Sequence, residues 1–185
     1  MTKARHYPGK LSPAPARGLR LFLLLVAIAA LAGCGGGRET VRRGAPPAHR
    51  VWPVVEPADP AAANAVLMRA FSLVGTPYRY GGNTPEGGFD CSGLVNYIYR
   101  DMLDLKLPRT SRELAQVQGP KIAPERLAAA DLVFFGSRGN VSHVGIYVGE
   151  GRFVHAPSTG GTVRLDRLDG PYWADHYSGA RRVLR

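Results

Sequence analysis

The chain has 185 residues, which is enough for one domain of ordinary size. Its formal net charge is +10, but a basic N-terminal segment carries five of the 24 lysines and arginines, so 19 remain against 14 acidic residues. This modest excess suits an anionic surface or polymer of the cell envelope. Nucleic-acid binding is not indicated, because there is no basic helix face, no interleaving of basic and aromatic residues and no zinc-finger spacing.

Residues 1–33 have the composition of a secretory signal peptide. Basic residues, with no acidic residue among them, precede the apolar run LFLLLVAIAALA. This run is too short to cross a bilayer as a helix, which needs about 20 residues. At its end lies the sequence LAGC, residues 31–34, which resembles the lipobox of bacterial lipoproteins. That resemblance implies that Cys34 is lipidated and becomes the first residue of the mature chain.

Acyl chains on Cys34 would anchor the protein without a transmembrane helix, since each buried CH₂ contributes about 0.8 kcal/mol. Gly35 is not the aspartate that resembles an inner-membrane retention signal, so we expect attachment to the outer membrane, facing the periplasm. The alternative is a secreted protein in which Cys34 is an ordinary residue. If Cys34 is acylated, Cys91 has no disulfide partner, which favours a use for its thiol.

Residues 34–60 are rich in glycine, proline and arginine and show no apolar period. We expect a flexible tether with a reach on the order of 25 to 30 Å. Packing of the sequence VWPVV, residues 51–55, on the domain is the alternative. The folded domain is predicted over residues 61–185.

Three helices are predicted in the first half of this domain. The first begins with Asp59 as N-cap and Pro60 at the first helical position, and it stops at Gly75. A loop rich in turn formers follows over residues 75–88. The second helix begins after Asp90, and the third has a capping box formed by Thr110 and Glu113 and ends at Gly119.

The second half of the domain has the pattern of short β-strands. Five segments rich in β-forming residues are separated by glycine, proline or asparagine, which indicates an antiparallel meander. They cover residues 131–136, 142–149, 152–157, 162–166 and 180–184. Helices followed by strands predict an α+β domain.

Cys91 is the first candidate for a functional residue. It follows the predicted N-cap Asp90, so it would lie in the first helical turn, where unpaired N–H groups and the helix dipole favour an anion. We therefore expect a pKa below the value of about 8.5 of a free cysteine, and a thiolate. The alternative is a buried cysteine that only packs.

His143 and His155 are the second and third candidates, each on a predicted strand. A two-residue turn between the strands would put the two side chains on opposite faces of the sheet. A three-residue loop over 149–151, with Gly151 at positive φ, would place His155 opposite Gly145 and on the face of His143. We predict that loop, with His143 as general base and His155 as the residue that orients its ring.

Two other interpretations of these residues are weaker. Each histidine could be a structural residue. Zinc binding by Cys91, His143 and His155 is disfavoured, because Cys91 has no second ligand close by in the sequence. We expect neither a metal nor a cofactor.

Ordered blocks through residues 64–185 resemble the NlpC family of bacterial cell-wall cysteine peptidases. The blocks are GTPYRYGG, GFDCSGLV, LPRTS, DLVFF, SHVGIYVGEGRFVHAPSTGG and PYWADHYSGARRV. The resemblance implies a reduced papain-like fold, with N-terminal helices packed on a small antiparallel sheet. It also implies that Cys91 is the nucleophile, His143 the base and His155 the third polar residue.

The resemblance further implies that Tyr80 lies close to the nucleophile and shapes the oxyanion and substrate site, and that Asp90 and Ser92 contact the peptide stem. The chain departs from the family pattern at Ala129-Ala130, where Pro-Gly is common, and at Leu114, where glutamine is common. These departures put the substrate preference in doubt more than the chemistry.

The activity implied is hydrolysis of amide bonds in the stem peptides of peptidoglycan, with the D-Ala–diaminopimelate cross-link as the favoured bond. The alternatives are cleavage between γ-D-Glu and diaminopimelate, and a non-catalytic envelope lipoprotein that binds murein. An acyltransferase on a permuted scaffold is disfavoured, because the nucleophile precedes the base in the chain. The expected partners are peptidoglycan, a membrane through the lipid on Cys34, and an unidentified regulator or adaptor.

Overall fold

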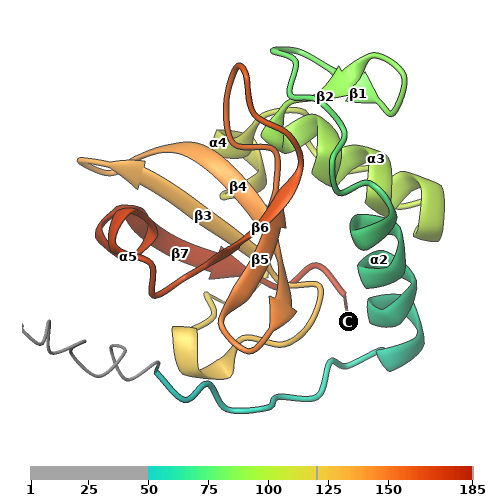
Figure 1. Ribbon diagram of the computed structural model, residues 1–185. Helices are drawn as coiled ribbons and strands as arrows, with labels where there is room; N and C mark the ends of the chain where they lie inside the picture. Colours follow the sequence, from blue (N-terminus) through green and yellow to red (C-terminus); the bar gives the residue numbers. More distant parts are fainter. Residues whose placement is uncertain (1–49, 120, 185) are drawn as a thin grey trace, which may run out of the picture. The chain divides into compact units, whose positions relative to one another are not determined.

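The computed structural model describes residues 50–119 and 121–184 (Figure 1). Cys34, the predicted signal peptide and the predicted tether up to residue 49 lie outside the described residues. The described residues form one compact unit. Within the described part, no helix has the length and apolarity that crossing a bilayer requires.

The predicted helices are present, each with its predicted cap. Helix α2 (Pro60–Ser72) begins where the Asp59 carboxylate accepts a hydrogen bond of 2.9 Å from the Ala62 N–H. Helix α3 (Cys91–Leu103) is capped by Asp90. Helix α4 (Ser111–Leu114) has its capping box but is a single turn, shorter than predicted. A 3₁₀ turn, η1 (Pro124–Arg126), and helix α5 (Pro171–His176) were not predicted.

The main sheet has five antiparallel strands in the order β6-β5-β4-β3-β7. The first four follow one another as the predicted meander, whereas β7 returns to pair with β3 at the opposite edge. The strands are β3 (Leu132–Ser137), β4 (Asn140–Gly149), β5 (Arg152–His155), β6 (Arg164–Arg167) and β7 (Tyr177–Arg181). A small hairpin of β1 (Asn83–Thr84) and β2 (Gly88–Phe89) forms within the predicted loop.

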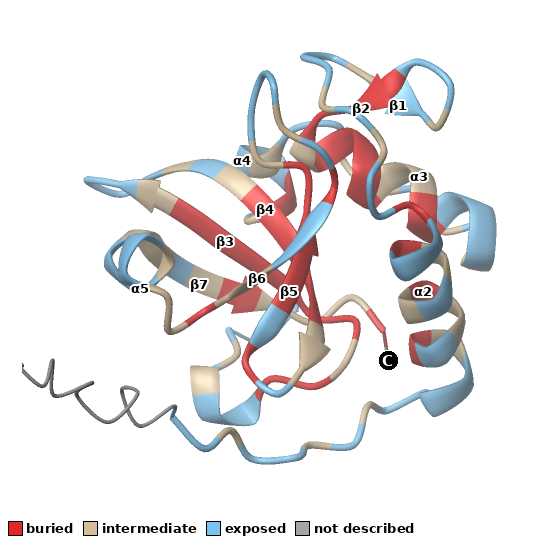
Figure 2. Ribbon diagram, viewed as in Figure 1, coloured by how far each residue is buried: buried red, intermediate tan, exposed pale blue. Residues whose placement is uncertain are grey.

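The sheet buries residues on both of its faces, because side chains alternate along each strand. On one face α3 packs against β4, and α2 packs against α3 (Figure 2). Leu94 and Ile98 belong to the same buried cluster as Val144 and Ile146. A second buried cluster covers the other face. Its members are Leu127, Val133, Phe135, Tyr147, Phe153, Leu168 and Ala180. The α+β prediction is confirmed.

Residues 50–58, here called the N-terminal strap, run along the domain instead of forming the flexible linker that was predicted (Figure 1). Trp52 packs against the second buried cluster, and its ring centroid lies 6.4 Å from that of Tyr147. The Arg50 guanidinium lies 4.6 Å above the Trp52 ring and pairs with Glu125. Burial of the Trp52 ring holds the strap on the domain. The Gly-, Pro- and Arg-rich composition of the segment did not indicate this packing.

Candidate active site

Cys91 is the first residue of α3, and its thiol packs between this helix and the sheet. The backbone N–H groups of Val144 on β4 and of Ser92 are near enough to the sulfur to favour its ionised form. The segment before β1 packs closely against the same helix end: a Cβ atom at Gly93 would overlap the Gly82 carbonyl oxygen. The glycine at position 93 thus allows the segment before β1 to approach the start of α3.

The predicted low pKa of Cys91 is not what the structure indicates. Burial raises the pKa of this thiol, and the nearby Asp90 carboxylate raises it further. The N–H groups of the helix end act in the opposite direction but do not outweigh burial. At rest the site therefore holds a neutral thiol, and a base is needed to form the thiolate.

His143 and His155 lie on the same face of the sheet, as predicted. His143 Nε2 and His155 Nδ1 are 2.8 Å apart, and the two rings are nearly perpendicular at 82°. The strands pair Ile146 with Val154, which puts His155 opposite Gly145. A Cβ atom at position 145 would lie 2.6 Å from the Phe153 ring and 3.3 Å from the His155 Cβ, so glycine makes this close packing possible.

The turn that sets this register differs from the predicted three-residue loop. Gly149 pairs with Arg152, so the turn contains only Glu150 and Gly151, with φ values of 51° and 70°. The extra residue that keeps the histidines on one face is in a bulge between Tyr147 and Gly149. The predicted register and the positive φ of Gly151 are confirmed, and the loop length is wrong.

Both imidazoles are neutral near pH 7. Burial and the neighbouring His155 lower the pKa of His143 to about 3, while Asp166 acts in the opposite direction. Burial likewise lowers the pKa of His155 to about 4. A neutral imidazole has a lone pair, so His143 is available as a base for the neutral thiol.

The sequence analysis missed two residues that contact the histidine pair. His155 Nε2 is 3.1 Å from Oδ2 of Asp166 on β6. The Trp173 ring stacks on His143 at 5.3 Å between centroids, and its indole N–H donates a hydrogen bond of 2.8 Å to the same Oδ2. Asp166 was within a predicted strand, and Trp173 was within a block that carries the family resemblance.

Asp90 and Ser92 are held by a third missed residue, Arg109. The Arg109 guanidinium donates to both Asp90 oxygens, at 3.0 and 2.8 Å, and to the Ser92 hydroxyl at 2.8 Å. Asp90 also accepts from the N–H groups of Gly93 and Gly81. Burial raises the pKa of Asp90, but the hydrogen bonds from Arg109 and Gly93 outweigh it and hold that pKa below its usual value. Both side chains are nearly buried and support the helix end, and their predicted contact with a peptide stem stays a prediction.

The tyrosine beside the thiol is Tyr78, whereas Tyr80 was predicted. The Tyr80 side chain is 90% exposed. Tyr78 packs against the same cluster as Cys91, and burial, with a further contribution from Cys91, raises the pKa of its hydroxyl. Residues 78–80 do not form a regular strand. An alternating pattern of buried and exposed side chains therefore could not show which of the two tyrosines points inward.

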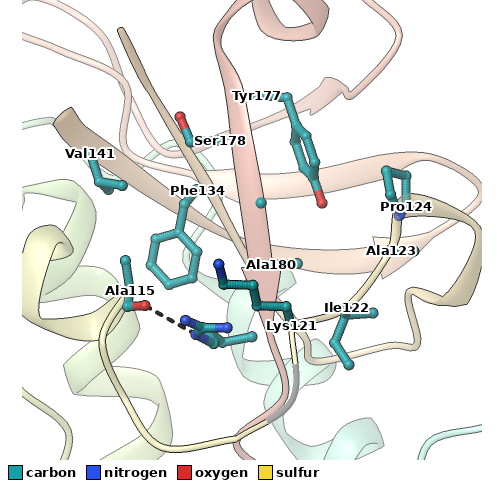
Figure 3. Close-up of a pocket in the computed structure, with 12 residues that line it drawn as sticks. Ala115, Lys121, Ile122, Ala123, Pro124, Phe134, Val141, Tyr177, Ser178 and Ala180 are labelled. Atoms are coloured by element: carbon teal, nitrogen blue, oxygen red, sulfur yellow. Dashed lines mark hydrogen bonds between the residues drawn. The ribbon is translucent and has the colours of Figure 1, made fainter. Parts of the chain in front are cut away.

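A polar groove of about 310 Å³ borders His143. Ser142, Tyr172 and His176 are among the residues that line it, and the exposed Tyr172 ring stacks on His176 at 4.2 Å. A separate pocket of about 510 Å³ lies between β7 and the segment around Lys121 and contains none of the three predicted catalytic residues (Figure 3). Within the described ranges, no group of three or more histidine, cysteine or acidic residues has the arrangement of a metal site.

Residues 75–182 match the NlpC/P60 family. The chain belongs to the NlpC/P60 family. This confirms the family resemblance, and the domain is of the cysteine-peptidase type that was predicted.

Curated relatives carry names of cell-wall hydrolases. Murein DD-endopeptidase MepH of Escherichia coli K12 is 42% identical over 126 residues, which is 66% of this chain and 46% of that protein. Probable endopeptidase NlpC of the same organism is 39% identical over 167 residues, or 89% of this chain and 100% of that protein. The gamma-DL-glutamyl hydrolase of Bacillus subtilis is 41% identical, covering 68% of this chain and 30% of that protein. The chain thus spans less than half of MepH and of the Bacillus hydrolase.

Solved structures of the NlpC/P60 family share the fold. A family member from Bacillus cereus has a TM-score of 0.63 at 32% identity, covering 66% of this chain and 40% of that one. RipD from Mycobacterium tuberculosis has a TM-score of 0.55 at 29% identity, covering 66% of this chain and 98% of that one. RipD is described as a non-catalytic NlpC/P60 protein adapted to peptidoglycan binding.

Proposed function

We propose that this NlpC/P60 protein is a peptidoglycan endopeptidase with Cys91 as nucleophile and His143 as general base. The observation that carries the proposal is the imidazole pair at 2.8 Å, in which His143 lies on β4 next to Val144, whose N–H group is near the Cys91 sulfur. The names of MepH and of the other cell-wall relatives support the substrate class.

The reaction follows from the groups present. His143 takes the proton of the Cys91 thiol, and the sulfur attacks the scissile carbonyl. The N–H groups of Cys91 and Ser92 at the start of α3 stabilise the oxyanion. His143 then gives its proton to the leaving amine, which departs and leaves a thioester. Water, deprotonated by His143, hydrolyses this acyl-enzyme and restores the thiol.

We further propose the D-Ala–diaminopimelate cross-link as the bond that is cut. Because His143 must protonate the leaving amine, the amine side of the substrate lies on the side of His143. The groove of about 310 Å³ on that side has room for a bulky leaving group. The charge of Asp90 is neutralised by its ion pair with Arg109. Asp90 therefore offers no free negative charge to bind the terminal ammonium group of a short stem peptide. This favours a scissile bond inside a cross-link.

Cleavage between γ-D-Glu and diaminopimelate is the second candidate, supported by the Bacillus hydrolase that matches the chain. A non-catalytic binding role, as described for RipD, is the third. The retained Cys91, His143 and His155 disfavour it, because a binding protein needs no nucleophile and base.

We also propose that the protein is attached to the outer membrane through acylated Cys34 and faces the periplasm. The support is the LAGC sequence and the preceding signal-like segment. Palmitate labelling of cells that produce the wild-type chain, lost in Cys34→Ala, is the expected result. Labelling that persists in Cys34→Ala would exclude this anchor. A protein regulator or adaptor remains a prediction.

The activity test uses the full chain with Cys34→Ala, since the N-terminal strap packs on the domain and should be kept. The protein is incubated with diaminopimelate-type peptidoglycan, and the muropeptides are identified by mass spectrometry beside the same chain with Cys91→Ala. Loss of cross-linked dimers with release of intact tetrapeptide monomers is expected. Dipeptide stems would instead indicate the γ-D-Glu bond, and products that do not depend on Cys91 would refute the proposal.

A further inference from the structure

The carboxylate of Asp166 lies at the end of a chain of hydrogen bonds that leads to the predicted base. Its Oδ2 atom is 3.1 Å from His155 Nε2, and His155 Nδ1 is 2.8 Å from His143 Nε2. The Arg164 guanidinium donates a hydrogen bond of 2.9 Å to the same Oδ2. Burial alone would raise the pKa of Asp166, but the hydrogen bonds from Arg164 and Trp173 hold it below its usual value, so the carboxylate is ionised.

The ionised carboxylate determines where each imidazole carries its proton. A carboxylate only accepts hydrogen bonds, so His155 must carry its proton on Nε2. Neutral His155 then has a lone pair on Nδ1 and accepts from His143, whose proton must be on Nε2. The lone pair of His143 is therefore on Nδ1, the nitrogen that is free to take the thiol proton.

Trp173 contacts both Asp166 and the two imidazoles. Its indole N–H donates to Oδ2 of Asp166, which fixes the ring at one edge. Its face stacks on His143 with an angle of 28° between the planes, and it meets the His155 ring edge-on at 4.8 Å. The Asp166 carboxylate thus restrains both imidazoles. It restrains His155 by direct contact and His143 through the indole of Trp173.

We infer that Asp166 is a positioning residue of this site, which selects the tautomers of His155 and His143 and holds Trp173 against His143. The inference deepens the proposed function and rests on it for the catalytic consequence. When Cys91 gives its proton to His143 Nδ1, the sulfur keeps the electron pair and His143 becomes a cation with both nitrogens protonated. Asp166 is the anion next to the pair, and Arg164 is the cation paired with it.

The direct test is the tautomer of each ring in the full chain with Cys34→Ala. Histidine-labelled protein gives two-bond ¹H–¹⁵N spectra in which the Nδ1–H and Nε2–H forms differ, and His143→Gln and His155→Gln assign the signals. Both rings should be Nε2–H tautomers at pH 7. A proton on Nδ1 of either ring would overturn the inference, and this result does not depend on any activity.

The catalytic test compares Asp166→Asn with Asp169→Asn. Asp169 is also paired with an arginine, Arg167, but forms no hydrogen bond with either imidazole in the described structure. An asparagine amide can donate to His155 Nε2 and so reverse both tautomers. We expect kcat to fall about 10²-fold in Asp166→Asn with little change in KM, less than the roughly 10⁴-fold loss when the direct orienting residue of a triad is changed. Asp169→Asn should retain wild-type kcat.

The pH profile separates positioning from a merely structural role. The Asp166 charge raises the pKa of both imidazoles, so in Asp166→Asn the acid limb of kcat/KM should move to lower pH. Asp166→Glu should restore part of kcat. If Asp166→Asn retains kcat within about threefold of the wild type, the inference is refuted. Nε2–H tautomers in a chain without Cys91-dependent activity would refute the proposed function and leave the tautomer assignment intact.

Discussion

Replacement of Arg109 by methionine tests whether the Asp90–Arg109 pair supports the end of α3. The side chain of Asp90 is only 13% exposed, and two parallel hydrogen bonds join it to Arg109. Breaking a fully buried ion pair costs about 3 to 5 kcal/mol. Arg109 is 44% exposed, and solvent screening reduces this figure. The N–H groups of Gly93 and Gly81 still satisfy Asp90, so we expect a loss of about 1 to 2 kcal/mol in the free energy of unfolding.

The loss should depend on pH in a defined direction. The folded pKa of Asp90 is lowered, so the stabilisation is present above its unfolded pKa of about 3.9 and disappears as the pH falls through the folded value. Urea unfolding at pH 7 and at pH 3 should therefore show a difference between wild type and Arg109→Met that shrinks at the lower pH. Arg112→Met, at an exposed position on α4, is the control and should change stability by less than about 0.5 kcal/mol.

The same variant should change the reactivity of Cys91. Asp90 raises the pKa of the thiol, and Arg109 offsets this charge, so its loss should raise that pKa further. Iodoacetamide should then alkylate Cys91 more slowly at pH 7.5 in Arg109→Met, and Asp90→Asn in the same chain should restore the rate. An unchanged alkylation rate, with a stability difference that is equal at pH 3 and pH 7, would refute this account of the helix end.

Three further predictions concern the thiol, the hairpin and the strap. In the Cys34→Ala chain, the pH midpoint of Cys91 alkylation should lie above the value of about 8.5 of a free cysteine, because burial raises its pKa, and a midpoint below about 7 would restore the predicted thiolate. Gly145→Ala should cost about 1 to 3 kcal/mol and reduce hydrolysis, since its Cβ would overlap the Phe153 ring; thermal unfolding within about 0.5 kcal/mol of wild type would contradict this. Trp52→Ala should cost about 1 to 3 kcal/mol in urea unfolding, whereas Val54→Ala, 89% exposed, should cost little, and equal effects would show that the strap does not contribute.

The features that the sequence predicted well are those encoded locally. Asp59, Asp90 and Thr110 each cap a helix because the cap and the backbone N–H that it binds are within three residues. The relation of His143 to His155 was predictable because both belong to one hairpin, whose register depends on a few residues of its turn. Even there, the prediction placed the one extra residue in the turn, whereas the structure has it in a bulge of β4.

The features that were missed depend on contacts across the fold. Arg109 reaches Asp90 over 19 residues, and no spacing rule predicts an ion pair at that separation. Asp166 meets His155 only because β6 pairs with β5 in a particular register. The pKa of Cys91 was predicted in the wrong direction because the helix end is visible in the sequence, whereas the burial that outweighs it comes from packing against β4.

The side chain of His155 has no exposed surface, so the middle of the hydrogen-bond chain is sealed from water. A proton that passes from Cys91 to His143 cannot leak to the solvent through His155. His143, by contrast, lines the groove, so in the proposed mechanism the departing amine would take the proton from His143 on that side. We therefore expect the His143 proton to exchange with the buffer on the side of the groove, and a leaving group bound in the groove to slow that exchange.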